Sequence, residues 1–142
     1  MKLVVLFLVA VCCCALGIGA NIEQNQLDEV LKILDAVKRE QLNNTKKLSS
    51  PPNDIEEHCC PSALKCFQVN LKGHFNATNK NIFRLEKSLR KIDTIFSRNF
   101  SNSGNNTTTC HACNSHPEVS VQEFLNRLRS LIERARSKLT MK

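Results

Sequence analysis

The sequence predicts an all-α protein, an up-up-down-down four-helix bundle with two long crossover connections. Four segments carry apolar residues at the spacing of amphipathic helices, and no segment shows a convincing strand pattern. The first and second helices are joined by a long link, as are the third and fourth, whereas the second and third are joined by a short one. Because parallel neighbours need connections that run the length of the bundle, these links favour the up-up-down-down order.

The N-terminal end of the chain predicts export. The chain has 142 residues, and residues 1–20 begin with Met1 and Lys2 and continue as an uncharged apolar run that ends in the small residues Gly17, Gly19 and Ala20. This is the pattern of a cleaved secretory signal peptide, and it leaves 21–142 as a single four-helix domain. An uncleaved signal anchor is the alternative, but the glycines thin out the hydrophobicity and no basic cluster follows. We therefore expect a secreted, extracellular protein with no membrane insertion after cleavage.

The first helix is expected over 24–42, where apolar residues recur mostly every three or four positions. It is acidic, with 3 basic against 5 acidic residues over 22–42. A polar stretch and then Pro51 and Pro52 follow, which predicts a loop because proline cannot continue a helix.

The second helix is expected over 54–71. Asp54 and Glu57 have the spacing of a capping box, although Pro61 inside the segment argues for a bend or a later start. A polar, turn-rich stretch follows it and predicts a short surface link to the third helix.

The third helix is expected over 80–98 and the fourth from Ser120, whose capping box is completed by Glu123, to about residue 139. Both predicted helices have a basic outer side. The basic residues are Lys80, Arg84, Lys87, Arg90, Lys91 and Arg98 on the third helix, and Arg127, Arg129, Arg134, Arg136 and Lys138 on the fourth.

The cysteines of the predicted mature chain favour disulfides, since an exported protein meets an oxidising compartment. These five are Cys59, Cys60, Cys66, Cys110 and Cys113. Seven residues of helix and three residues of extended chain both cover about 10 Å, so two bridges could clip the second crossover along the second helix. Cys60 is the extra thiol: it could be free, replace Cys59, or join two chains, although a monomer is expected.

The same cysteines and the histidines near them allow two other interpretations, a redox pair and a zinc site. Cys110 and Cys113 have the spacing of a redox pair, but that motif belongs to a βαβ setting that is missing from the predicted elements. His58, His111 and His116 lie near the cysteines, so a zinc site is possible on paper. In an exported protein the disulfides are favoured, with the histidines as ordinary surface residues. We expect no metal and no cofactor.

Five N-x-Ser/Thr sequons agree with export and predict glycosylated surface positions. They are Asn43, Asn76, Asn99, Asn105 and Asn106.

Three motifs resemble the interleukin-2, -15 and -21 group of short-chain helical cytokines. They are Cys59-Cys-Pro-Ser-Ala-Leu-Lys-Cys66-Phe-Gln, Cys110-His-Ala-Cys113 and Gln122-Glu-Phe-Leu-Asn-Arg-Leu-Arg-Ser-Leu131, within a resemblance over roughly 27–139. The resemblance implies disulfides Cys59–Cys110 and Cys66–Cys113.

The resemblance also implies a function. Such a protein bridges a private type I cytokine receptor chain and the common gamma chain, and so starts JAK–STAT signalling in lymphocytes. The first and third helices would face the private chain, and the first and fourth the common chain. The implied receptor-binding residues are Arg84, Lys87, Arg90, Lys91, Arg129, Glu133 and Arg136.

Three features depart from the family. Glu133 stands where the family usually has Gln, and Arg136 stands at an apolar contact position. The first helix is acidic where the family has several arginines. Either its receptor surface has changed charge, or its residues are aligned with the family's first helix in the wrong register.

Other classes of function are less favoured. The basic segment 120–142 could belong to a membrane-active host-defence or heparin-binding protein, but its aliphatic stripe without Trp is typical of a packed core helix. The sequence has no nucleophile elbow, glycine-rich phosphate loop or H-E-x-x-H motif, so we expect no enzyme. Nucleic-acid binding is not expected, because aromatic residues do not alternate with the basic ones.

Overall fold

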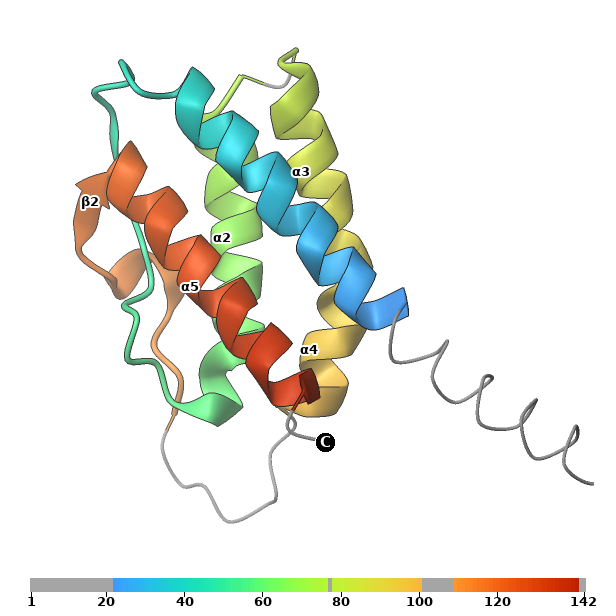
Figure 1. The fold of residues 1–142 in the computed structure, drawn as a ribbon. Coiled ribbons are helices and arrows are strands. Elements are labelled where there is room, and N and C mark those ends of the chain that lie inside the picture. The colour runs from blue at the N-terminus through green and yellow to red at the C-terminus, as the bar shows by residue number, and fades with distance from the viewer. Residues whose placement is uncertain (1–21, 77, 101–108, 141–142) are drawn as a thin grey trace, which may run out of the picture.

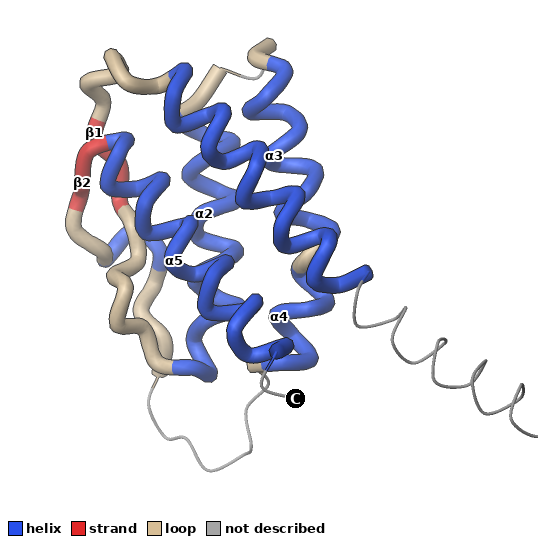
Figure 2. Tube along the Cα trace, viewed as in Figure 1, coloured by secondary structure: helices blue, strands red, loops and turns tan. Residues whose placement is uncertain are grey.

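The computed structural model describes residues 22–76, 78–100 and 109–140, and the predicted signal peptide lies outside them. The described chain is mostly helical, with one small antiparallel sheet (Figures 1 and 2). Its elements in order are a helix over residues 22–40, β1 (Lys47–Ser49), the 3-10 turn η1 (Glu57–Cys59), α2 (Cys60–His74), α3 (Lys80–Lys91), α4 (Asp93–Asn99), the 3-10 turn η2 (Cys113–Ser115), β2 (Glu118–Ser120) and α5 (Val121–Thr140). An all-α bundle is compatible with this set of elements.

The helices bury their apolar stripes against one another around a single core. Its centre is aromatic: Phe67 on α2 meets Phe124 on α5 edge to face, with ring centroids 5.1 Å apart, and Phe75 lies 6.1 Å from Phe124. All three rings are buried, so they hold the C-terminal half of α2 against the first turn of α5.

The first predicted helix is present over residues 22–40 and buries Leu27, Val30, Leu34 and Val37. These positions step by three, four and three, which keeps them on one side of a helix. Leu42 was expected to continue this apolar stripe, but it lies beyond the helix and is 66% exposed.

The predicted start of the second helix at Asp54 is wrong. Helix α2 begins at Cys60, and Pro61 lies in its first turn, where the missing N–H costs nothing. Asp54 lies in an exposed turn before η1, and Cys59 at the N-cap makes no side-chain cap bond. The helix also runs past the predicted end, to His74. Pro61 therefore marks the beginning of the helix.

The third predicted helix is two consecutive helices, α3 and α4, separated by Ile92. Asn79 caps α3, since its Oδ1 accepts from the backbone N–H of Asn81 and Ile82 at 2.9 and 3.2 Å. At the interruption, Gln68 on α2 donates to the Leu89 carbonyl at 3.2 Å and to Asp93 at 2.9 Å. The Leu89 carbonyl also accepts from the Ile92 N–H at 3.2 Å, so the side chain of the neighbouring helix adds a second hydrogen bond at the break.

The prediction that no strand forms is wrong. β1 and β2 pair antiparallel with Leu48 opposite Val119, and Ser50 N–H donates to the Pro117 carbonyl at 3.3 Å. Each strand has only three residues, too few for alternation to be recognised in the sequence. The pairing brings the two long connections side by side next to the start of α5 (Figure 2).

The predicted cap of the last helix is present at Ser120, whose Oγ accepts from the Glu123 N–H at 3.2 Å. Helix α5 then follows the predicted stripe, burying Val121, Phe124, Leu125, Leu128, Leu131, Ile132 and Ala135.

We predict that Phe124→Ala destabilises the protein by about 3–5 kcal/mol, because it opens a cavity between α2 and α5. Urea unfolding measures this loss. Phe83→Ala is the matched control: Phe83 is 55% exposed, so its removal should change the free energy of unfolding by less than about 0.5 kcal/mol. Equal losses in the two variants would contradict this core.

Candidate functional site

The first candidate surface is the outer side of α3, which we call the α3 strip: Phe83, Arg84, Lys87, Arg90 and Lys91. All five side chains are exposed, because the opposite side of the helix carries the buried stripe. Within the part of the chain that the structure describes, none of the four basic residues forms an ion pair. The α3 strip therefore presents four uncompensated positive charges around an exposed ring.

Phe83 was not singled out from the sequence. It follows the buried Ile82 directly and lies four residues before Lys87, so it falls on the basic side of the helix. An apolar residue off the buried stripe was the signal that could have identified it.

The basic residues of α5 are arranged differently, because all five contact other groups of the protein. Arg127 pairs with Glu123 at 3.0 Å, Arg129 pairs with Asp35 and Glu133, Arg134 donates to the Ile55 carbonyl at 2.6 Å, Arg136 pairs with Asp28 at 2.9 Å, and Lys138 pairs with Glu57 at 3.0 Å. The free basic face predicted for this helix is thus largely neutralised within the fold.

Two of these ion pairs join α5 to the helix over residues 22–40, and we call them the charge ladder: Asp28–Arg136 and Asp35–Arg129. The two aspartates are seven residues apart, and so are the two arginines, which is about two helical turns. The earlier aspartate pairs with the later arginine, as expected for helices that run in opposite directions. The acidic character of the first helix is therefore explained inside the molecule.

A polar groove of 500 Å³ lies along the charge ladder. Its lining comes from the two helices and comprises Asn25, Asp28, Glu29, Leu31, Lys32, Asp35 and Arg129. This surface carries both signs of charge, in contrast to the α3 strip.

Two disulfides connect α2 and its preceding turn to the second crossover: Cys59–Cys110 and Cys66–Cys113, with Cα atoms 5.5 and 5.2 Å apart. These are the two pairs that the family resemblance implies. The first bridge to form closes a loop of about 50 residues, which stabilises a small domain by about 4 kcal/mol on the chain-entropy model. Asn70 adds a polar contact at the same place, since its Nδ2 donates to the Ser49 carbonyl at 2.7 Å.

The two disulfides argue against the redox pair and against a metal site built on these cysteines. Cys110 and Cys113 bond to different cysteines of the α2 region, so they are not a redox pair in this state. His58, Cys59 and Cys110 place ligand atoms within 4.8 Å of one another, but the two sulfurs are joined as a disulfide and offer no thiolate to a metal.

Cys60 is a free thiol with no exposed surface. Burial raises its pKa, so it stays protonated and poorly reactive at neutral pH. A disulfide between two chains through Cys60 would need the start of α2 to open first.

The sequons are not equivalent. Asn43 and Asn76 are exposed, and Asn105 and Asn106 lie outside the described residues. The prediction that Asn99 is a surface position is wrong: it is 7% exposed, and its Nδ2 donates to the Ile95 carbonyl at 2.7 Å inside α4. A glycan on that nitrogen is incompatible with this packing.

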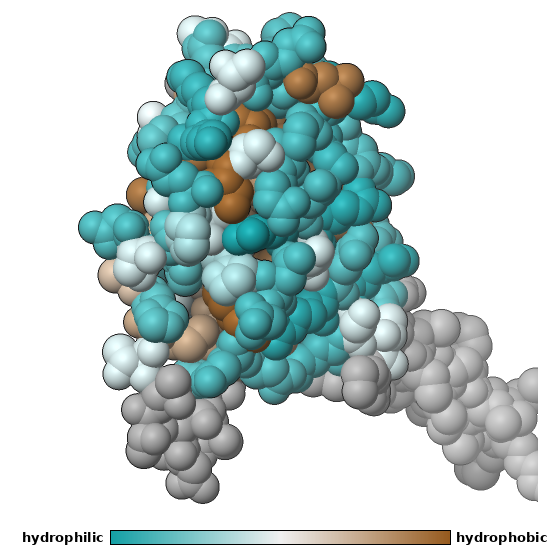
Figure 3. Space-filling model, turned by 90° about the vertical axis from the view of Figure 1, so that its left-hand side faces the viewer, coloured by the Kyte–Doolittle hydropathy of each residue, from teal (hydrophilic) through white to brown (hydrophobic). Residues whose placement is uncertain are grey.

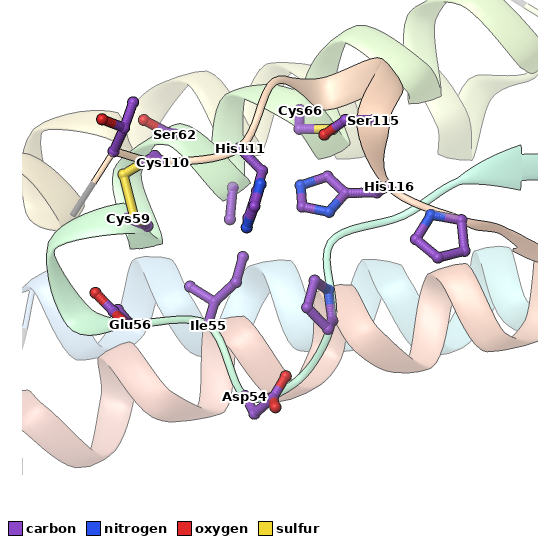
Figure 4. A pocket seen from close by; sticks show the side chains of 14 residues that line it. Asp54, Ile55, Glu56, Cys59, Ser62, Cys66, Cys110, His111, Ser115 and His116 are labelled. Atoms are coloured by element: carbon purple, nitrogen blue, oxygen red, sulfur yellow. A yellow bond between two sulfur atoms is a disulfide. The ribbon is translucent and has the colours of Figure 1, made fainter.

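The second crossover covers a cavity of 530 Å³ between the two disulfides (Figure 4). His111 and His116 both line it. Burial, with smaller contributions from His111 and Arg127, lowers the pKa of His116, so this imidazole is neutral at physiological pH. Figure 3, which views the molecule from the side of this crossover, shows a mainly hydrophilic surface with small separate apolar patches.

No family model matches the chain. Among the described helices, none has both the length and the apolar character needed to cross a membrane. The interpretation of function therefore depends on the motifs and on the surfaces described above.

We predict that the charge ladder contributes a small, salt-sensitive coupling. In a double-mutant cycle, Asp28→Ala and Arg136→Ala should couple by about 0.2–1 kcal/mol at low ionic strength, since both side chains are partly exposed. Urea unfolding measures the coupling, which should fade in concentrated salt. The matched control pairs Asp28→Ala with Arg90→Ala and should show none; coupling of equal size there would contradict the ladder.

Proposed function

We propose that this protein is a secreted cytokine of the interleukin-2, -15 and -21 group. It bridges a private type I receptor chain, similar to the interleukin-21 receptor, and the common gamma chain, and so triggers JAK–STAT signalling in lymphocytes. Within the group, Ser62-Ala63, Phe67-Gln68 and the short gap from Cys113 to Glu123 favour interleukin-21. A member similar to interleukin-15 is the alternative.

The order of the helices supports this proposal. In Figure 1 the helix over residues 22–40 and α2 run toward one end of the molecule, and α3, α4 and α5 run back. We infer the up-up-down-down arrangement of short-chain cytokines from these directions and from the long connections, residues 41–56 and 100–117.

The observation that carries the proposal is the contrast between two separate surfaces. The α3 strip has four cations with no ion-pair partner among the described residues, whereas the face between the first helix and α5 is internally neutralised by the charge ladder. A ligand that holds two different receptor chains needs two such unlike surfaces, since each has to reject the other's partner.

The proposed mechanism involves no chemistry in the ligand, and we assign the protein no enzymatic activity. Signalling follows when two receptor tails are brought together at a fixed separation. Packed helices, with two disulfides that hold the second crossover against α2, provide that separation, because a preorganised surface loses little conformational freedom on binding.

The α3 strip would engage acidic loops of the private chain. Its charges accelerate encounter with an acidic partner, and Phe83 supplies an apolar anchor at its centre. The groove along the charge ladder, with Arg129, Glu133 and Arg136 on α5, would face the common gamma chain.

A membrane-active or heparin-binding role for α5 is disfavoured by its ion pairs, because carboxylates of the same protein already neutralise most of its cations. Tighter binding of the intact protein to anionic than to neutral lipid vesicles would revive that alternative.

We predict that Arg84→Glu with Arg90→Glu slows association with the private receptor ectodomain at least tenfold at low salt and leaves binding to the common gamma chain unchanged. Surface plasmon resonance against each immobilised ectodomain measures both. The matched control is Lys65→Glu with Lys72→Glu, an equal charge change on the exposed side of α2.

Equal loss in the two double variants would assign the effect to net charge and contradict a specific role for the α3 strip. Absence of binding to the common gamma chain and to every candidate private chain would end the cytokine proposal.

A further inference from the structure

Two histidines, His111 and His116, line the cavity beneath the second crossover. It lies between the first turns of α2, residues 52–56 of the first crossover and residues 109–117 of the second. Figure 4 shows the imidazoles of His111 and His116 turned into this space from the second crossover. The receptor surfaces proposed above use neither residue.

The two imidazoles are close enough to share one ion. Their ring centroids are 6.1 Å apart, with an interplanar angle of 74°. A zinc–nitrogen bond of about 2.0–2.1 Å places the metal about 3.2 Å from a ring centre, so two rings on one metal have centroids at most about 6.4 Å apart. Tetrahedral coordination requires the two ring centroids to be about 5 Å apart. Side-chain rotations that move the rings about 1 Å closer together would reach this distance.

The backbone that carries both histidines is already fixed. Ser115 N–H and His116 N–H donate to the Ala112 and Cys113 carbonyls at 3.0 and 3.4 Å, and Ser115 Oγ donates to Ala112 at 2.6 Å. The disulfides at Cys110 and Cys113 hold the same segment against α2. Binding an ion would therefore order little more than two side chains.

Two carboxylates line the cavity besides the histidines. They belong to Asp54 and Glu56, and Glu56 contacts His58 at 3.4 Å. The positive charge of Arg127 also reaches His116 and would repel a cation there, but Arg127 is paired with Glu123 at 3.0 Å. The disulfide sulfurs contribute no thiolate, so nitrogen and oxygen are the ligands available.

We propose that His111 and His116 bind a divalent transition metal of the zinc and copper class at the wall of this cavity. Imidazole suits these ions, and water would complete the coordination. Such an ion would cross-link two positions of the second crossover, which the disulfides already attach to the α2 region. This inference does not depend on the proposed receptor function.

The test is isothermal titration of the intact, disulfide-bonded protein with zinc chloride, with magnesium chloride as the non-binding ion. We expect one zinc per chain, and at least about tenfold weaker binding in each of His111→Gln and His116→Gln, because each removes one of two protein nitrogens. His74→Gln is the matched control, since His74 is exposed at the far end of α2.

A second readout separates ligation from damage to the fold. Zinc should shift the imidazole NMR signals of His111 and His116 and leave that of His74 in place, while non-reducing peptide mapping verifies both disulfides in each variant. No zinc binding, binding retained in both variants, a loss confined to one of them, or an equal loss in His74→Gln would overturn the site.

Discussion

Two disulfides hold residues 110–117 against α2, and several other features depend on that attachment. It fixes where the second crossover runs, and hence where β2 can pair with β1 and where α5 begins. The cavity lined by His111 and His116 exists only because the crossover is held above α2. Each bridge closes a loop of about 50 residues, so the oxidised state stabilises both the fold and the spacing of its outer faces.

The distribution of charge divides the helices into two kinds. On α5, cations are used inside the molecule: the charge ladder joins this helix to residues 22–40, and Lys138 reaches Glu57. On α3, the four basic residues of the α3 strip are exposed and form no ion pair with any described residue, and this gives the proposed private-receptor face its electrostatic character.

Much of this fold could be predicted from the sequence, because helical periodicity is strong wherever a stripe is buried. The helices around Val30, Leu85 and Leu128 follow directly from that pattern. What could not be predicted depends on contacts between distant segments. The three-residue strands exist because the disulfides and α5 bring them together, and the start of α2 was missed because Asp54 and Glu57 imitate a cap. The partners of Asp28 and Asp35 lie about 100 residues away along the chain, so the acidic first helix could be explained only in three dimensions. Asn99 satisfies the sequon pattern, but its burial inside α4 is a tertiary effect.

The proposed function requires one chain to engage two receptors through separate faces at the same time. Sedimentation velocity of the protein mixed with both soluble receptor ectodomains tests this most directly. We expect a single complex that contains one copy of each of the three proteins. It should form from either binary complex when the missing receptor is added. Mutually exclusive binding, in which one ectodomain displaces the other, would contradict it.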